Sequence, residues 1–549
     1  MATIRHLILT LTTFFYASIG LAQEIPDPVG WCQQMLWDPV GVPSELRKGG
    51  GNPPDEVLYA LSLSGGGYRA MLFHIGTLHR LNDARRLSKL KVVSSVSGGS
   101  ITAAVLAHRW EQLKFDPNGY AENLREVIEE PLRDLAGKTI GKPSVLEGAL
   151  GSSTAPKILS HKLNSILFAT ASRPTALLTD IRSDPTKRNP RPIFIFLSTN
   201  LQTGELMQFR GNLVGGPQIG WTAPGDIALS DVVAASAGFP PFFAPLKLKL
   251  PHGVGTWLEC SENRDNPFGI DPRNEPARAI DNANLDAMRK EVFLADGGIR
   301  DNLGVSAIEE INRIRRIRWN AFGLYPYHKY NTVTFISDGG AATAIDQHPS
   351  TTWLGVFGRV TSLMSDQPND LRIENIVRSN SLATLQGTDY SNFMRNPCDE
   401  PYKKSLLERD LVLRNYVNSL PGDGFAYWSI RRMPKVHVGL QCPEVKATPW
   451  MREEVRALAS VPTDLAILDR RLQARLINWG YLSAHHGMPY ISELVRNRDE
   501  LNKFLNECKM PFSAVEVDPD GYTASARDAL CLPFREWNMP YSRPTQEED

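Results

Sequence analysis

The chain is organised around the stretch Val92-Val93-Ser94-Ser95-Val96-Ser97-Gly98-Gly99-Ser100. Its apolar, β-branched start predicts a strand, and a helical pattern from Ile101 to Arg109 begins directly after the glycines. A serine at such a turn exposes its hydroxyl at the end of a sheet, and the N–H groups that follow it lie at a helix N-terminus, which favours an oxyanion. The stretch therefore predicts a nucleophile at Ser97, on a turn similar to G-x-S-x-G in which Ser95 replaces the first glycine.

Three consecutive glycines lie between an earlier predicted strand and helix. The run Val57 to Leu63 is typical of a strand, and it leads into Ser64-Gly65-Gly66-Gly67-Tyr68-Arg69-Ala70 and a helical pattern as far as Leu87. Such glycines let the backbone approach a ligand and turn several N–H groups toward one point. The loop lacks the G-x-x-x-x-G-K-[ST] and G-x-G-x-x-G spacings, which disfavours nucleotide binding. Two interpretations remain, an oxyanion hole beside Ser97 and a tight turn without function.

A third motif ends the buried run Val292-Phe293-Leu294-Ala295. It is Asp296-Gly297-Gly298, and an aspartate before glycines is often only a turn former. Its functional meaning depends on whether it meets Ser97. Strands that alternate with helices predict an α/β sheet, so we expect the glycine loop, Ser97 and Asp296 to lie along one edge where strands end.

The hydrophobic periodicity predicts further elements. Residues 110–190 are expected to be mainly helical, and the run from 238 to 245, rich in aromatic residues and proline, is expected to line a substrate pocket or to pack in the core. The helix over residues 351–365 is amphipathic and fits a core-facing helix or a lipid-facing lid. The other predicted elements are a strand at Pro192–Leu197, a helix at Asp231–Phe243, a strand at Val436–Leu440 and a helix at Leu465–Leu482.

The N-terminus is predicted to be a secretory signal peptide. Arg5 and His6 precede an apolar stretch from Leu7 to Leu21, and the small residues before Gln23 fit cleavage after Ala22. An uncleaved membrane anchor is the alternative, although the stretch is short for a span. Lys and Arg (60) balance Asp and Glu (60), so the charge does not favour a nucleic-acid partner.

Six cysteines follow the predicted cleavage site. None forms a C-x-x-C pair, so a zinc or thioredoxin-like site is not expected. In an exported protein this even, scattered set predicts disulfides, whose pairing stays open. The cysteines are Cys32, Cys260, Cys398, Cys442, Cys508 and Cys531.

The motifs S-G-G-G-Y-R, S-x-S-G-G and D-G-G, in this order, resemble those of the patatin-like phospholipase family. Three further stretches extend the resemblance, which covers roughly residues 56–485. They are T-N-L-x-T-G-E at Thr199–Glu205, A-S-A-x-x-P at Ala235–Pro240 and I-N-W-G-Y at Ile477–Tyr481.

The resemblance implies a three-layer α/β fold, with a central mixed, mostly parallel sheet flanked by helices. It implies a Ser–Asp dyad without histidine, in which Ser97 is the nucleophile and Asp296 the base. It also implies that Arg69 orients the glycine loop or meets a phosphate headgroup, while a structural ion pair is the alternative. Backbone N–H groups would hold the oxyanion, and the expected donors are Gly65, Gly66, Gly67 and Gly98.

The expected protein is thus an exported serine acyl hydrolase, periplasmic or secreted, that acts on lipid esters and foremost on phospholipids at a membrane surface. No metal, no organic cofactor and no spanning helix after signal cleavage are expected. The predicted division is a signal peptide at 1–22, an irregular segment at 23–55, a catalytic domain at 56–490 and a C-terminal extension at 491–549.

Two alternatives belong to other classes. A lipid-binding protein without catalysis is compatible with the same fold. A Ser-His-Asp esterase would need a histidine base, and the chain order Ser…Asp…His permits His485 or His486. The candidates by residue type alone are His74, His79, His108, His252, His485 and His486.

Replacing both His485 and His486 tests the esterase alternative. A Ser–Asp dyad needs neither imidazole, so we expect the double variant to retain most of the wild-type rate of ester hydrolysis. Loss of that rate in a folded double variant would instead support a histidine base.

Overall fold

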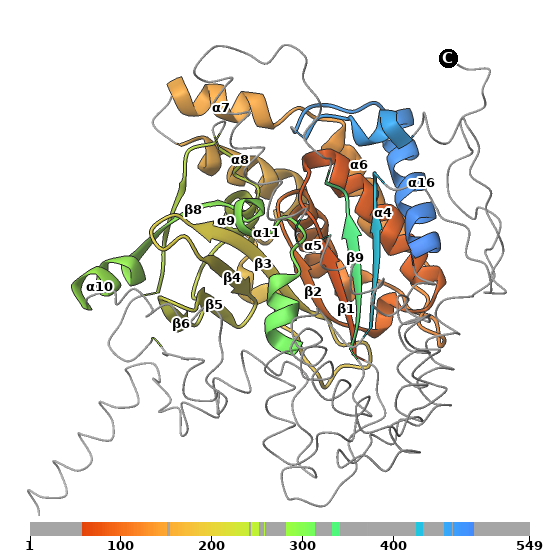
Figure 1. The fold of residues 1–549 in the computed structure, drawn as a ribbon, viewed down its shortest axis with the longest axis horizontal. Helices are drawn as coiled ribbons and strands as arrows, with labels where there is room; N and C mark the ends of the chain where they lie inside the picture. Colours follow the sequence, from red (N-terminus) through yellow and green to blue (C-terminus); the bar gives the residue numbers. More distant parts are fainter. Residues whose placement is uncertain are drawn as a thin grey trace, which may run out of the picture.

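The computed structural model of the protein describes only part of the chain (Figure 1). Several predicted features lie outside that part: the signal peptide, the helix over 351–365, the strand over 436–440 and all six cysteines. The described residues are 58–150, 154–240, 243–251, 257, 282–312, 332–340, 371, 373, 424–431, 455–463 and 465–487.

The described strands form one ten-stranded mixed sheet, in the order β10-β9-β1-β2-β3-β4-β5-β6, with β8 paired to β3 and β7 to β8. The neighbours from β10 to β3 are parallel, and every other pair is antiparallel. The strands are β1 (Leu58–Leu63), β2 (Leu90–Ser95), β3 (Ile193–Asn200), β4 (Leu206–Arg210), β5 (Leu213–Gly216), β6 (Gly220–Thr222), β7 (Leu246–Lys249), β8 (Glu291–Asp296), β9 (Thr332–Asp338) and β10 (Gly424–Ser429).

Helices flank this sheet, as predicted. The α-helices are α4 (Gly67–Asp83), α5 (Gly98–Arg109), α6 (Glu130–Ala136), α7 (Gly141–Leu150), α8 (Ala155–Leu163), α9 (Leu229–Ser236), α10 (Asn282–Lys290), α11 (Gly298–Asp301) and α16 (Arg470–Gly487). Short 3₁₀ segments are η2 (Leu87–Lys89), η3 (Trp110–Gln112) and η6 (Leu178–Ile181), and π segments are η4 (Arg125–Glu129) and η5 (Asn164–Phe168).

Both faces of the parallel strands are buried. In β1, Leu61 and Leu63 pack into the main core, which also contains residues of α4, α5 and α16. Leu58 and Ala60 point to the opposite face, where they pack against residues 307–311. Burial on two faces explains why these strands are continuous apolar runs in the sequence rather than alternating ones.

Ser97 and Asp296 were expected at one sheet edge formed by the ends of strands, but β2 and β8 are arranged differently. β2 pairs in parallel with the first half of β3, up to Ser95 opposite Phe196. β8 pairs antiparallel with the second half of β3, and its last residue, Asp296, lies opposite Ser198. Each strand has two edges, and β4 occupies the other edge of β3, so β2 and β8 meet end to end on the same edge. The predicted meeting of Ser97 and Asp296 therefore arises from opposed strands, not from parallel neighbours.

Several element boundaries differ from the sequence predictions. The predicted strands at 57–63, 192–197 and 292–295 are present as β1, β3 and β8. The helix from the glycine loop ends at Asp83 rather than Leu87, and α9 ends at Ser236 because the chain then turns at Gly238. Periodicity did not indicate β4 to β7, β9 or β10; of these, β5, β6 and β7 have four residues or fewer, and β6 and β10 lie at the margins of the sheet.

Helices α4 and α16 cross at glycines, and Figure 1 shows them side by side. A Cβ on Gly480 would lie 1.8 Å from the carbonyl oxygen of Phe73, and one on Gly76 would lie 1.9 Å from that of Ile477. The two backbones therefore touch, which requires residues without a side chain at both positions. Through this contact α16 shares the main core with α4 and α5.

We predict that Gly480→Ala lowers the free energy of unfolding by about 2–4 kcal/mol, because the added methyl group must push α16 away from α4. Chemical denaturation of both proteins measures the difference. Gly137→Ala is the matched control, since its nearest neighbouring atom would be 3.4 Å from the new Cβ. Equal effects of the two substitutions would contradict the argument from the helix crossing.

Candidate active site

Ser97 lies on a strained turn between β2 and α5. Its backbone angles are φ 52° and ψ −121°, and α5 begins at the next residue. A non-glycine residue at positive φ costs on the order of 1–3 kcal/mol and persists only where neighbours hold it. The Ser97 N–H donates to Ser236 Oγ at 3.0 Å, and the Ser236 hydroxyl donates to the Leu197 carbonyl at 2.7 Å. Ser236 thereby ties the turn to β3.

Ser95 occupies the position where the first glycine of the turn motif is usual. Its side chain is buried, and its hydroxyl accepts a hydrogen bond from Ser100 Oγ at 3.1 Å. Ser100 Oγ is also 2.9 Å from Ser236 Oγ. The serine at this position therefore fits the turn because its hydroxyl joins the serine network beneath it.

Asp296 ends β8 beside Ser97, and the Ser97 side chain is hydrogen-bonded to its carboxylate. One carboxylate oxygen, Oδ1, also accepts the N–H of Gly298 at 2.7 Å. Burial raises the pKa of Asp296 to about 7, because it disfavours the charged carboxylate more than these two hydrogen bonds favour it. Sequence reasoning placed these two residues together, and the structure does so.

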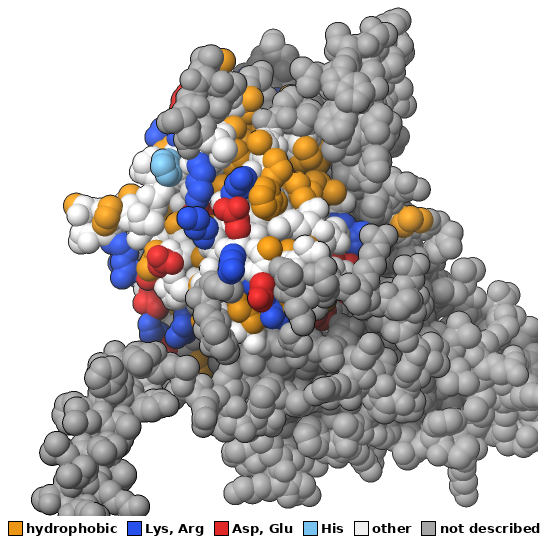
Figure 2. All heavy atoms as spheres, turned by 90° about the vertical axis from the view of Figure 1, so that its left-hand side faces the viewer, with side chains coloured by type: hydrophobic (Ala, Val, Ile, Leu, Met, Phe, Trp, Pro, Cys, Tyr) orange, Lys and Arg blue, Asp and Glu red, His pale blue; other side chains and the backbone are white. Residues whose placement is uncertain are grey.

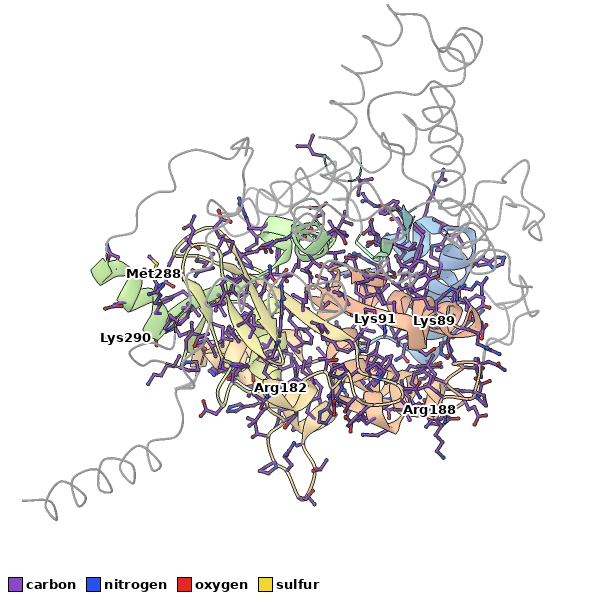
Figure 3. All side chains as sticks on the ribbon, turned by 90° about the horizontal axis from the view of Figure 1, so that it is seen from below. Lys89, Lys91, Arg182, Arg188, Met288 and Lys290 are labelled. Carbon is purple, nitrogen blue, oxygen red and sulfur yellow. The ribbon has the colours of Figure 1, made fainter. Side chains whose placement is uncertain are left out.

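Among the described residues, no cation contributes to the pKa of this carboxyl. Lys89 and Lys91 lie at the other end of β2, where Figure 3 labels them next to each other. At about 3.3 Å per residue, Lys91 is roughly 20 Å along the strand from Ser97. The basic end of β2 is therefore separated from the site by the length of the strand.

The N-termini of α4 and α5 converge beside Ser97. A Cβ on Gly98 would lie 2.2 Å from the Gly67 carbonyl oxygen, so the two backbones are in contact. Within the described part of the chain, the N–H groups of Gly66, Gly67 and Gly98 donate no hydrogen bond. Such donors at helix N-termini attract negative charge. Their position makes them candidate oxyanion donors, as predicted for these three glycines.

The prediction for Gly65 is wrong. Its N–H already donates to the Asn302 carbonyl at 2.9 Å, so it is not free to bind an oxyanion. The cause is the packing of the segment after α11 against the glycine loop, which the sequence did not indicate. A Cβ on Gly65 would lie 2.2 Å from Asn302 Oδ1, so a larger residue there would require the Asn302 side chain to shift.

Arg69 is buried behind the glycine loop rather than directed outward. Its Nε donates to the Gly339 carbonyl at 3.0 Å and one Nη donates to the Val461 carbonyl at 2.5 Å. Only 2% of the residue is exposed. Of the three roles considered for Arg69, orientation of the loop fits these contacts, and contact with a headgroup does not.

The described histidines are not partners of the dyad. His74 contacts Ser337 and Ser64, and His79 contacts Glu129. His108 packs on Phe168, and His485 is buried in α16. In the part of the chain described here, no histidine is hydrogen-bonded to Ser97 or Asp296; His252 and the side chain of His486 lie outside it.

Sequence reasoning did not assign the roles of two residues that support the site, Ser236 and Asn302. Ser236 lies in the A-S-A-x-x-P stretch, which carried a resemblance but no assigned contact. Asn302 lies six residues after Asp296, and its side chain fills the space that Gly65 and Gly298 leave open. For Asn302, the only hint in the sequence was that a small polar residue follows the D-G-G turn. Among the described residues, no three His, Cys, Asp or Glu side chains gather as a metal site would require.

Comparison with known proteins finds one family model that matches part of the chain. The family model described as patatin-like phospholipase matches residues 61–308. The match includes Ser97, Asp296 and the glycine loop, so lipid acyl hydrolysis is the chemistry that the family supports for this site. No curated protein matches the chain.

The similar solved structures are distant in sequence. Human GIVD cytosolic phospholipase A2 is 14% identical, with a TM-score of 0.39, over 81% of this chain and 61% of that chain. Its complex with methyl gamma-linolenyl fluorophosphonate is 13% identical, with a TM-score of 0.36, over 83% and 62%. VipD from Legionella pneumophila is 14% identical, with a TM-score of 0.28, over 87% and 84%. The chain thus spans about three fifths of the length of the human structures.

The raised pKa of Asp296 makes a prediction about stability. Between about pH 4 and pH 7 an unfolded chain ionises this carboxyl while the folded chain keeps it protonated, so its contribution to stability is lost as the pH rises through 7. Asp296→Asn removes that loss. We expect the variant to be more stable than wild type at pH 8 by roughly 1–3 kcal/mol, with little gain at pH 4.

Denaturation curves across this pH range measure the gain. Asp226→Asn, on an exposed turn, is the control and should show no such trend. A gain for Asp296→Asn that is the same at pH 4 and pH 8 would contradict the assignment of a buried, raised pKa.

Proposed function

We propose that the protein hydrolyses carboxylic esters of lipids, phospholipids among them, through an acyl-enzyme on Ser97 with Asp296 as the base. One observation carries the proposal: a serine on a strained turn is hydrogen-bonded to a buried carboxylate whose pKa is about 7. A base with a pKa near the working pH is the most effective in general base catalysis. The patatin-like phospholipase match supports the lipid substrate.

In the first half of the reaction, Ser97 Oγ attacks the ester carbonyl carbon while Asp296 accepts the hydroxyl proton. The carbonyl oxygen becomes an oxyanion, and the N–H groups of Gly66, Gly67 and Gly98 are its proposed donors. Each such donor contributes about 10²–10³ in rate. The intermediate then collapses, the alcohol part leaves, and Asp296 returns the proton to the leaving oxygen.

In the second half, a water molecule attacks the acyl carbon and gives its proton to Asp296. The ester bond to Ser97 breaks, the fatty acid leaves, and the proton returns to Ser97 Oγ. The same carboxylate thus acts as base and acid in both halves, which a pKa near 7 permits. The chemistry needs no cofactor.

A membrane surface is the proposed location of the substrate. No helix in the described residues has the length and apolar character needed to cross a bilayer. Figure 2 shows one face on which apolar side chains gather beside charged ones of both signs. Such a surface suits peripheral contact with lipid headgroups rather than insertion.

We also propose that the protein is exported to the periplasm or secreted. The support is the apolar stretch from Leu7 to Leu21 with a basic start, and the fit of a cleavage site after Ala22. Mass spectrometry of the protein recovered outside the cytoplasm would find Gln23 at its N-terminus. A mature chain that retains Met1 would exclude cleavage.

The principal test of the proposed function is release of fatty acid from mixed phospholipid vesicles. We expect the wild-type protein to release fatty acid, and Ser97→Ala and Asp296→Asn to lower the rate by about 10³-fold or more. The kcat/KM of wild type should fall with decreasing pH below about 7, because protonated Asp296 accepts no proton. Ser230→Ala, on the same helix as Ser236, is the control for a buried serine.

Each other outcome would exclude a different part of the proposal. Hydrolysis of short esters without release of fatty acid from vesicles would keep the dyad and remove the phospholipid substrate. Activity that persists in Ser97→Ala would exclude the mechanism. No hydrolysis and no reaction of Ser97 with a fluorophosphonate would favour a lipid-binding protein without catalysis.

A further inference from the structure

A fully buried histidine lies behind the glycine loop. His74 belongs to α4, and none of its surface is exposed. Its Nε2 is 2.9 Å from the Ser64 carbonyl oxygen, and its Nδ1 is 2.9 Å from Ser337 Oγ. It contacts neither Ser97 nor Asp296, so the proposed chemistry does not use it directly.

Only one proton of His74 is fixed by its partners. The indole N–H of Trp428 donates to Thr77 Oγ1 at 3.1 Å. Thr77 Oγ1 is 2.9 Å from Ser337 Oγ, which in turn contacts His74 Nδ1. The Ser64 carbonyl can only accept, so Nε2 of His74 carries a proton. In the neutral imidazole Nδ1 then has no proton and accepts from the Ser337 hydroxyl.

Burial supports the same protonation state. It lowers the pKa of His74 to about 4, against smaller opposing effects of the Ser64 hydrogen bond and of Asp338. Both ring nitrogens have partners that suit the neutral form, and burial outweighs the two effects that favour a second proton.

The Ser64 carbonyl controls the peptide that enters the loop. It accepts the Gly99 N–H at 3.1 Å as well as the imidazole. On the other side of the same peptide, the Gly65 N–H donates to the Asn302 carbonyl. The peptide is therefore held at its C=O and at its N–H, and it cannot rotate. Gly66 and Gly67, which follow it, take their direction from it.

We propose that His74 is a positioning residue for the oxyanion hole: its Nε2–H fixes the Ser64–Gly65 peptide so that the N–H groups of Gly66 and Gly67 face the oxygen that develops at Ser97. This inference rests on the proposed function. Misplacement of reacting groups by about 1 Å costs about 10²-fold in rate, so a distant hydrogen bond that sets the loop has a measurable effect.

Two amide variants distinguish the two ring nitrogens. A glutamine amide nitrogen is as many bonds from Cβ as His Nε2 is, so His74→Gln can still donate to Ser64. The shorter asparagine reaches only the position of Nδ1, so His74→Asn can contact Ser337 but not Ser64. We expect kcat to fall by about 10–100-fold in His74→Asn with KM changed less than about threefold, and His74→Gln to stay within about fivefold of wild type.

Thr102→Val is the matched control. Thr102 is buried and donates one hydrogen bond to the Met71 carbonyl of α4, away from the glycine loop. We expect Thr102→Val to lower the stability of the protein and to leave kcat unchanged. Equal impairment of His74→Asn and His74→Gln, or equal loss in Thr102→Val at the same melting temperature, would overturn the proposal.

A second variant covers the case in which His74→Asn does not fold. Ser337→Ala removes the hydroxyl that donates to Nδ1 and keeps the imidazole, so we expect a fall in kcat of about 3–10-fold. An unchanged kcat would overturn the role of the chain of hydrogen bonds.

Two measurements do not need lipid turnover. The rate at which a fluorophosphonate modifies Ser97 should be highest in wild type, lower in His74→Gln and lowest in His74→Asn. Nitrogen-15 NMR should find Nδ1 of His74 unprotonated at pH 7, and a proton on Nδ1 instead would refute the assigned direction. If the protein cleaves no lipid ester but Ser97 is modified, the proposed function fails while these rates still decide the role of His74. If Ser97 is not modified at all, both proposals fail.

Discussion

The end-to-end meeting of β2 and β8 on one edge of β3 is the constraint on which the site depends. Backbone pairing fixes where each strand stops, and the stops bring Ser97 and Asp296 into hydrogen-bonding contact. The serine network then holds the turn, because Ser236 joins the Ser97 N–H to the β3 backbone. Ser97 and Asp296, the proposed nucleophile and base, are thus both positioned by the backbone of β3, a largely buried strand.

The same burial that prepares the base also weakens the fold. A carboxylate in this position is disfavoured by desolvation, and among the described residues the Gly298 N–H and the Ser97 hydroxyl bind it. The backbone of Ser97 is strained as well. Both costs fall at one junction, where the large apolar core around α4, α5 and α16 offsets them. The site therefore lowers the stability of the fold locally, and the surrounding core compensates for this cost.

The sequence predicted the parts of this site that depend on local patterns. Strand, turn and helix around Ser97 follow from residue type, and the D-G-G turn at Asp296 follows from its glycines. Gly65 was misassigned because its N–H is used by Asn302, a contact between segments far apart in the chain. The antiparallel course of β8 was likewise invisible, since a buried apolar run carries no sign of its direction. His74 was a candidate base by residue type alone, and only the tertiary contacts reveal its partners.

The order of strands along the chain has a consequence for when the site comes into being. β1, β2 and β3 carry the glycine loop and Ser97, but Asp296 arrives with β8, which follows β4 to β7 in the sequence. β8 pairs with β3 and with β7, so the contact between Ser97 and Asp296 joins an early and a late part of the described sheet. A segment that ends before β8 therefore contains the turn at Ser97 and lacks the carboxylate proposed as its base.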